Sequence, residues 1–229
     1  MGSANLAGRW PYRQVPRRRL HTSSRKGSQK HCSSTQKFFW PTVSLQTGVP
    51  IAHINTLCNL GKSELPIINV DSSSHLTWDC RSARCALGRA GIVCDKREGD
   101  GGTPSGILPI RRVLYRPDRM VPPETAVPIS ALEPDDGWCN DPTDSAYNYQ
   151  VKLPYPASCE TLWRVDHLYD VIGILGYNDD PVIPDRGSAI FLHVANSDYG
   201  PTEGCIALSL ADLKQLLGRI DLDSSIRIR

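Results

Sequence analysis

The sequence lacks a long apolar run, since polar residues and prolines interrupt its hydrophobic stretches. No segment reaches the roughly 20 consecutive apolar residues that a membrane-spanning helix needs, so we expect no membrane span. The run Val49–Cys58 is too interrupted to be the apolar core of a secretory signal, which a small-residue cleavage site should follow. With 40% hydrophobic and 22% charged residues, the composition is ordinary for a globular protein.

Acidic residues are missing from the first part of the chain. Residues 1–63 contain ten Lys or Arg and no Asp or Glu, whereas residues 64–229 contain sixteen basic and twenty-four acidic residues. Residues 1–40 also show no sustained apolar period, and such a segment buries too little surface to offset its ordering entropy. We therefore predict a basic, disordered tail at 1–63 and one folded domain at 64–229. The alternative role for the tail is an electrostatic arm for nucleic acid or another anionic surface, and its Arg- and Ser-rich start also mimics a transit peptide.

Cys-x-x-Cys pairs are also absent, although the chain has eight cysteines. Cys80, Cys85 and Cys94 could bind a metal together with His75, but their spacing differs from that of structural zinc sites. We expect no metal and no organic cofactor, and mostly reduced or buried thiols, although an oxidising compartment would allow some to pair. The segment Gly99–Gly106 is not followed by Gly-Lys-Ser/Thr, so it is not a phosphate loop. It is predicted to be a turn-rich connection that borders the candidate active site described below.

Short apolar and β-branched runs alternate with Gly, Pro, Asp and Asn, which predicts a mainly β domain. The predicted strands are Ile67–Val70, Ile107–Leu114, Val171–Leu175 and Ser188–Val194. One helix is predicted after Cys205, with Ser209 as its N-cap. Its apolar residues recur at helical spacing and are Leu213, Leu216, Leu217 and Ile220. The alternating segment Ser225–Arg229 is predicted to be a final edge strand.

The segments Gly187–Ala195 and Pro201–Ser209 carry the strongest indication of chemistry. An apolar run reaches His193, a short polar loop follows, and Cys205 comes directly after Gly204. A thiol is a weak nucleophile until it loses its proton, and a nearby imidazole can take that proton and hold the thiolate as an ion pair. Cys205 and His193 are therefore the candidate nucleophile and base, and the amides around Gly204 and Cys205 are candidate donors to an oxyanion. The alternative is a buried structural cysteine beside a histidine whose hydrogen bonds are satisfied.

Several ordered motifs extend over about 160 residues towards the C-terminus. They are Lys96–Pro109, Leu162–Asp170, Gly187–His193 and the box Thr202–Cys205. From Ile67 onwards, the chain resembles the L,D-transpeptidase catalytic domain, the YkuD type of bacterial peptidoglycan enzyme. The resemblance implies a β-sandwich with one or more short helices, with Cys205 as nucleophile, His193 as base and Gly204 in the oxyanion region. It also implies peptidoglycan stem peptides as partners, no nucleic acid, and a place in the bacterial cell envelope or periplasm.

The same resemblance implies a reaction. Cys205 would attack the carbonyl between the L-centre of a diamino acid and the following D-alanine of a stem peptide. D-Alanine would leave with a proton from His193, and an amine of a second stem would resolve the thioester into a cross-link. With water as acceptor, the same chemistry would make an L,D-carboxypeptidase or endopeptidase. An alternative of a different class is a non-enzymatic polyanion-binding protein whose cysteine is structural.

The cysteine box departs from the common family pattern Ser/Thr-His-Gly-Cys. Glu203 stands at the histidine position, and the spacing from His193 to Cys205 is shorter than in the best-known members. A carboxylate so close to the nucleophile should disfavour its thiolate, unless it braces a protonated histidine. Glu203 is therefore a candidate modulator of Cys205.

Three further segments are candidates for the walls of a peptide-binding cleft. Trp138–Pro142 and Tyr147–Tyr149 offer aromatic and polar side chains to a peptide, or they only pack. Trp163–Asp170 could also line the cleft, and His167 within it could orient a base. A structural place for His167 is the simpler interpretation.

Overall fold

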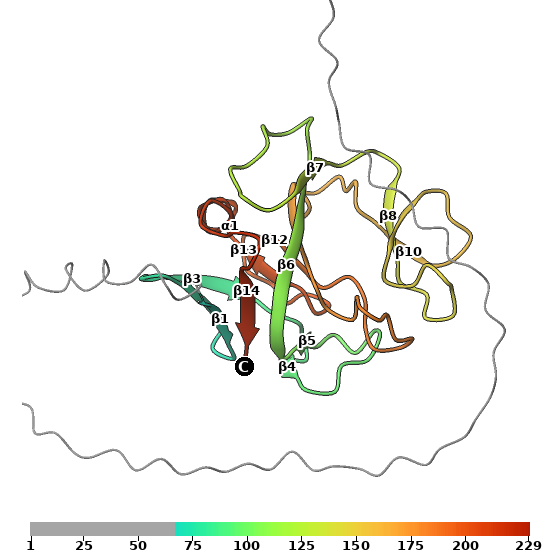
Figure 1. Ribbon diagram of the computed structural model, residues 1–229, viewed down its shortest axis with the longest axis horizontal. Helices are drawn as coiled ribbons and strands as arrows, with labels where there is room; N and C mark the ends of the chain where they lie inside the picture. The colour runs from blue at the N-terminus through green and yellow to red at the C-terminus, as the bar shows by residue number, and fades with distance from the viewer. Residues whose placement is uncertain (1–66) are drawn as a thin grey trace, which may run out of the picture. The chain divides into compact units, whose positions relative to one another are not determined.

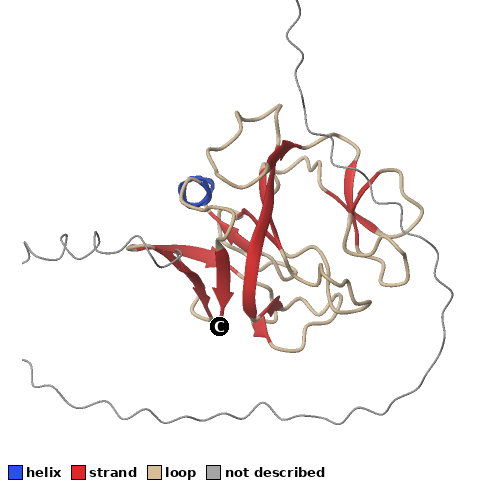
Figure 2. Ribbon diagram, in the orientation of Figure 1, coloured by secondary structure: helices blue, strands red, loops and turns tan. Residues whose placement is uncertain are grey.

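The computed structural model describes residues 67–229, and β-strands are the main element within them (Figures 1 and 2). The predicted tail at 1–63 lies outside the described residues. The strands are β1 (Ile67–Asp71), β2 (His75–Trp78), β3 (Arg81–Ala86), β4 (Ile92–Val93), β5 (Thr103–Pro104), β6 (Gly106–Tyr115), β7 (Ile129–Ala131), β8 (Asp136–Cys139), β9 (Gln150–Lys152), β10 (Cys159–Thr161), β11 (Val171–Leu175), β12 (Phe191–Val194), β13 (Ile206–Leu208) and β14 (Ser225–Ile228). The described helix is α1 (Leu210–Leu217). The prediction of a mainly β domain is confirmed.

The largest sheet folds back on itself to form two layers. Its strand order is β11-β12-β13-β3-β2-β1-β14-β6-β7, and β11 also pairs with β6. The long strand β6 joins the layers, because it pairs with β14 through Gly106–Pro109 and with β11 through Ile110–Tyr115. Strand β3 also joins the two layers, because it pairs with β2 through Arg81–Arg84 and with β13 through Cys85 and Ala86. The result is the expected β-sandwich, with two strands shared between its layers.

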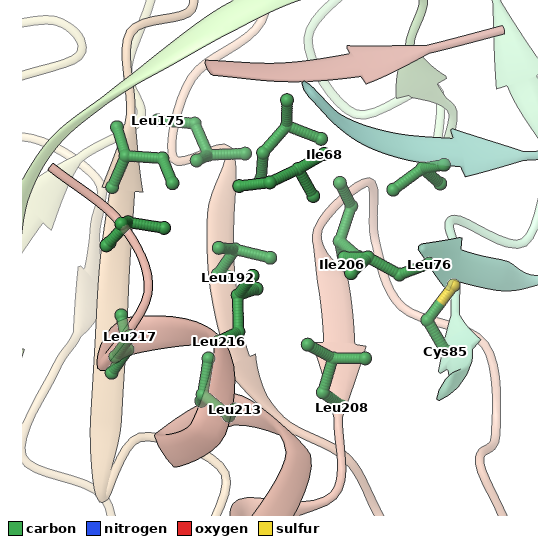
Figure 3. Close-up of a cluster of buried hydrophobic side chains, with 14 of the residues drawn as sticks. Ile68, Leu76, Cys85, Leu175, Leu192, Ile206, Leu208, Leu213, Leu216 and Leu217 are labelled. Carbon is green, nitrogen blue, oxygen red and sulfur yellow. The ribbon is translucent and has the colours of Figure 1, made fainter. Parts of the chain in front are cut away.

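The main hydrophobic core lies between these layers. Figure 3 shows side chains from β1, β2, β11, β12, β13 and α1 meeting in this space. Ile68, Leu192 and Ile206 come from three different strands and are fully buried. Each buried aliphatic side chain of this kind contributes about 1.5–3 kcal/mol through removal of apolar surface from water. Packing between the layers therefore holds the strands that carry the candidate site.

Helix α1 follows directly from the strand that comes after Cys205. Ser209 caps it as predicted, since its Oγ accepts a hydrogen bond from Asp212 N at 3.1 Å. Leu213, Leu216 and Leu217 are fully buried in the core. Ile220 lies beyond the end of the helix but is also buried, so the helix ends one turn earlier than the apolar spacing suggested.

A second hydrophobic cluster covers the outer face of β11 and β12. Ile172, Ile174 and Phe191 project from these strands towards Trp138 on β8, and the Trp138 and Phe191 rings meet edge to face at 5.1 Å. Strand β8 is the middle strand of a small sheet with the order β10-β8-β9. Both faces of β11 and β12 are therefore buried, and the small sheet is fixed beside the segment that carries His193.

Two strand predictions need correction. Strand β12 begins at Phe191 rather than Ser188, because Gly187 and Ala189 have positive φ angles of 93° and 53°, which interrupt the extended backbone of a strand. Strand β14 is not an edge strand, since it pairs with β1 on one side and β6 on the other. Its alternating sequence fixes which residues face the core but carries no information on how many neighbours the strand has. No helix in the described part of the chain is long and apolar enough to cross a membrane.

Candidate functional site

Two neighbouring parallel strands bring His193 and Cys205 to one place. His193 lies in β12, where it pairs in register with Ala207 of β13. Cys205 directly precedes β13, and its Sγ accepts a hydrogen bond of 3.4 Å from the N–H of Phe191. Both residues line the same cleft, which has a volume of about 540 Å³. The two residues that the sequence singled out therefore share one cleft, and their roles as nucleophile and base stay predictions.

The Cys205 thiol is buried and protonated at rest. Only 8% of the residue is exposed, and its Sγ donates a hydrogen bond to Ala189 O at 3.1 Å. Burial raises the pKa of Cys205 to about 12, and the negative charge of Glu160 contributes to this rise. The Phe191 N–H and the Lys96 ammonium act in the opposite direction on this pKa. At neutral pH the thiol therefore needs a base in order to react.

The His193 side chain is held as a neutral imidazole. Its Nδ1 lies 2.8 Å from Val194 O, and because a carbonyl oxygen can only accept, Nδ1 must carry the proton. The other ring nitrogen, Nε2, is then unprotonated and able to accept a proton. Burial lowers the pKa of His193 to about 4. The resting pair is thus a neutral thiol and a neutral imidazole, rather than the ion pair that sequence reasoning favoured, because desolvation disfavours both charged forms.

Thr202 fixes the conformation of the loop that carries Cys205. Its hydroxyl donates to Cys205 O at 2.7 Å and accepts from Gly204 N at 3.2 Å. Gly204 has a φ of 135°, and a Cβ there would lie 2.7 Å from Gly102 O, so only glycine fits. The bond to Thr202 means that the Gly204 amide must be released before it can serve an oxyanion. The oxyanion role of Gly204 and Cys205 stays a prediction.

Glu203 lines the cleft, and its carboxylate points towards Arg89. It forms an ion pair with Arg89, and its side chain is 77% exposed. No hydrogen bond or ion pair of the described residues joins this carboxylate to His193, whose ring Nδ1 is bonded to Val194 O. The carboxylate whose charge raises the pKa of Cys205 is that of Glu160. Glu203 was the candidate modulator because it is close to Cys205 in the sequence. Glu160 is 45 residues away and is brought near the thiol only by the fold.

Acceptor groups line the wall of the cleft on the side of the small sheet. Glu160, at β10, accepts a hydrogen bond from Tyr169 Oη at 2.5 Å. Its pKa is raised, chiefly by burial. Glu98 accepts from Tyr147 Oη at 2.5 Å and from Ser188 Oγ at 2.8 Å. Asn140 also lines this cleft, and its buried Oδ1 has no hydrogen-bond partner in the described structure.

Asn148 supports the backbone to which the Cys205 thiol is bonded. Its Oδ1 accepts from Ala189 N and from Trp138 Nε1, both at 3.0 Å. Its Nδ2 donates to the carbonyl oxygens of Tyr177 and Asn178 at 3.0 and 2.8 Å. The bond from Ala189 N supports the left-handed conformation of Ala189, whose carbonyl oxygen accepts the hydrogen bond from the Cys205 thiol. Sequence reasoning placed Asn148 only within an aromatic and polar segment.

The remaining predicted wall segments divide into two groups. Gly99 lines the cleft, so the connection Gly99–Gly106 borders the site as expected. Tyr169 also lines the cleft, and its ring lies 5.3 Å from that of His193. His167, by contrast, is exposed and bonded to Asp170 at 2.7 Å, which is the structural place favoured for it.

Metal binding has no support in this part of the chain. Among the residues that the structure describes, no group of three or more His, Cys, Asp or Glu side chains is placed to hold a metal ion. The four residues considered as metal ligands all lie in the described segment and form no such group; they are His75, Cys80, Cys85 and Cys94.

The fold and the site define a class of mainly β domains that bring a buried thiol and an imidazole into one polar cleft. Comparison with known protein families matches residues 66–228 to YkuD, the L,D-transpeptidase catalytic domain, and the chain belongs to this family. The family acts on peptidoglycan peptides and is one of cell-wall enzymes. A search among curated proteins finds no match.

Proposed function

We propose that this protein is a cysteine-dependent L,D-transpeptidase that joins peptidoglycan stem peptides through a thioester on Cys205. The observation that carries the proposal is the placement of Cys205 and His193 in one cleft, with His193 Nδ1 bonded to Val194 O. That bond leaves Nε2 as the proton acceptor. The described fold begins at Ile67, which is compatible with a catalytic domain at 64–229.

The neutral resting pair suggests that proton transfer accompanies the attack. As Sγ of Cys205 bonds to the carbonyl carbon before D-alanine, its proton passes to Nε2 of His193. The tetrahedral intermediate then collapses, the C–N bond breaks, and His193 returns the proton to the departing D-alanine nitrogen. An amine of a second stem attacks the thioester, loses its proton to His193, and releases Cys205 as a thiol.

The walls of the cleft favour a substrate with N–H donors. The carboxylates of Glu98 and Glu160 are acceptors, and both residues line the cleft with Cys205. Hydrogen bonds to a carboxylate are charge-assisted and contribute about 1.5–3 kcal/mol each, which favours a substrate amide or ammonium group at this wall. Stem peptides supply both kinds of donor, through their backbone amides and through the amine of the diamino acid.

Incubation of the protein with purified stem peptides, followed by mass spectrometry, tests this function. We expect cross-linked dimers and released D-alanine, and no product from Cys205→Ala, because the covalent route is then removed. His193→Ala should slow thioester formation by about 100-fold or more, since general-base assistance is typically of that size.

The products also separate the alternatives. Trimmed monomers without dimers would identify water as the acceptor and make the protein an L,D-carboxypeptidase or endopeptidase. Release of D-alanine by Cys205→Ala at the parental rate would overturn the mechanism. A protein that forms no covalent adduct with a carbapenem or a stem peptide at Cys205 would instead be a binding protein with a structural cysteine.

A further inference from the structure

Cys139 and Cys159 face each other across two adjacent strands of the small sheet. Strands β8 and β10 lie side by side (Figure 1). They are antiparallel, and Cys139 lies directly opposite Cys159. The backbone of Cys139 makes its hydrogen bonds on the side away from β10, with the segment that leads into β9. Its N–H donates to Tyr149 O and its carbonyl accepts from Asn148 N, each at 2.9 Å. The bonds towards β10 come from the flanking residue Asn140, whose N–H donates to Ser158 O at 3.1 Å.

This pattern makes Cys139 and Cys159 a non-hydrogen-bonded pair of the antiparallel ladder. The Cα atoms of such pairs lie about 4.5 Å apart, and their side chains project to the same face of the sheet. That separation falls within the range of about 4.4–6.8 Å that disulfides span. A disulfide could therefore form here with little displacement of the backbone.

The two thiols already contact each other. The pKa of Cys159 is raised to about 11, first by burial and then by the charge of Cys139 and a side-chain hydrogen bond with it. Cys139 is fully buried, whereas Cys159 is partly exposed. An external reagent therefore reaches Cys159 first, and Cys139 is placed to react next.

We propose that Cys139 and Cys159 form a cross-strand disulfide by exchange with a small-molecule or protein disulfide. The Cys159 thiolate attacks the external disulfide, so that one thiol is released and a mixed disulfide forms. The Cys139 thiolate then attacks the Cys159 sulfur and releases the second external thiol. Cys139 and Cys159 together lose two protons and two electrons, and the external disulfide gains them.

The cross-link would fix one wall of the cleft. Asn140 follows Cys139 directly and Glu160 follows Cys159, and both residues line the cleft with Cys205. A bond between the two cysteines ties the strands that present these acceptors. This inference is independent of the proposed reaction, because it depends only on the pairing of β8 and β10.

Peptide mapping of the full chain provides the test. The protein is fully reduced, exposed to oxidised glutathione at mildly alkaline pH, alkylated and digested. We expect a linked peptide containing Cys139 and Cys159, lighter by two hydrogens than the reduced pair, and joint protection of both from alkylation. The oxidised protein should also melt about 5 °C or more higher, because the disulfide closes a loop of about 20 residues.

Two variants serve as controls. Cys139→Ser should stop at a stable glutathione adduct on Cys159, because the resolving thiol is missing. Cys94→Ser, which removes an exposed free thiol outside the pair, should leave the cross-link unchanged. The inference is overturned if the parental protein retains a glutathione adduct on Cys159 with a free Cys139, or if both residues remain open to alkylation after oxidation.

Discussion

Burial sets the protonation states of the two candidate catalytic side chains. His193 is 5% exposed and Cys205 is 8% exposed, so the charged forms of both are desolvated. The pKa values move in opposite directions, to about 4 for His193 and about 12 for Cys205. Nearby charges modify this effect, and Glu160 is the carboxylate that acts on the thiol.

Replacement of Glu160 tests this electrostatic assignment. We expect Glu160→Gln to lower the pH midpoint for alkylation of Cys205 and to speed labelling near neutral pH by roughly two- to tenfold. The amide can still accept from Tyr169, so the local packing should survive. Labelling of Cys205 with iodoacetamide over a range of pH measures the midpoint.

Glu203→Gln is the matched control for that experiment. Its carboxylate is exposed and paired with Arg89, and the pKa of Cys205 rises through burial and Glu160. We expect the midpoint to change little. A larger shift in Glu203→Gln than in Glu160→Gln would return the modulating role to Glu203.

The depressed pKa of His193 also predicts a pH dependence of stability. The unfolded chain binds a proton at this residue below about 6.5, whereas the folded protein does so only near pH 4. Stability from His193 is therefore fully present above about pH 6.5 and is lost as the pH falls towards 4, by about 3 kcal/mol. Urea unfolding between pH 7 and pH 4 measures this slope, which should be shallower in His193→Gln. Equal slopes in the two proteins would contradict the buried neutral histidine.

At the level of secondary-structure elements, polar side chains hold the loops on which the site depends. Thr202 fixes the cysteine loop, and Asn148 joins the segment between β8 and β9 to the segment before β12. Ala189 lies in this second segment with a φ of 53°, which is costly for a residue other than glycine. The hydrogen bond from Ala189 N to Asn148 offsets part of that cost.

Asn148→Ala should therefore destabilise the protein strongly. The side chain is 5% exposed, and its loss leaves buried donors and acceptors unpaired. At about 1–3 kcal/mol for each unpaired group, we expect a loss of about 3 kcal/mol or more, measured by urea unfolding. Alkylation of Cys205 should also become faster, because the loop carrying Ala189 O is freed.

Gln150→Ala is a suitable comparison for that variant. Gln150 lies nearby on β9, where its side chain accepts a hydrogen bond of 2.7 Å from Arg112. We expect a smaller loss of stability and unchanged labelling of Cys205. Similar effects from both variants would show that Asn148 has no special role.

At the scale of the whole molecule, the described part of the chain builds two hydrophobic clusters from residues between Ile68 and Ile228. A fragment of residues 64–229 should therefore fold cooperatively. We expect its melting temperature to lie within a few degrees of that of the full chain, measured by circular dichroism. Its labelling of Cys205 should also be unchanged. A large fall in melting temperature would show that residues 1–63 contribute to the folded domain.

The sequence by itself determined the mainly β character, the capped helix after Cys205 and the candidate pair Cys205 and His193. These features are local, because strand periodicity, a cap at Ser209 and a family motif can all be recognised within short segments. For the same reason the sequence placed the modulating carboxylate at Glu203, two residues from the nucleophile.

Only the tertiary structure decided which distant residues surround that pair. It brought Glu160 close to Cys205, placed Asn148 under Ala189, and gave β14 two neighbours instead of one. It also set the neutral state of His193 and Cys205, because desolvation depends on everything packed around a group. These properties arise from strand pairing between segments far apart in the chain, and no local pattern encodes that pairing.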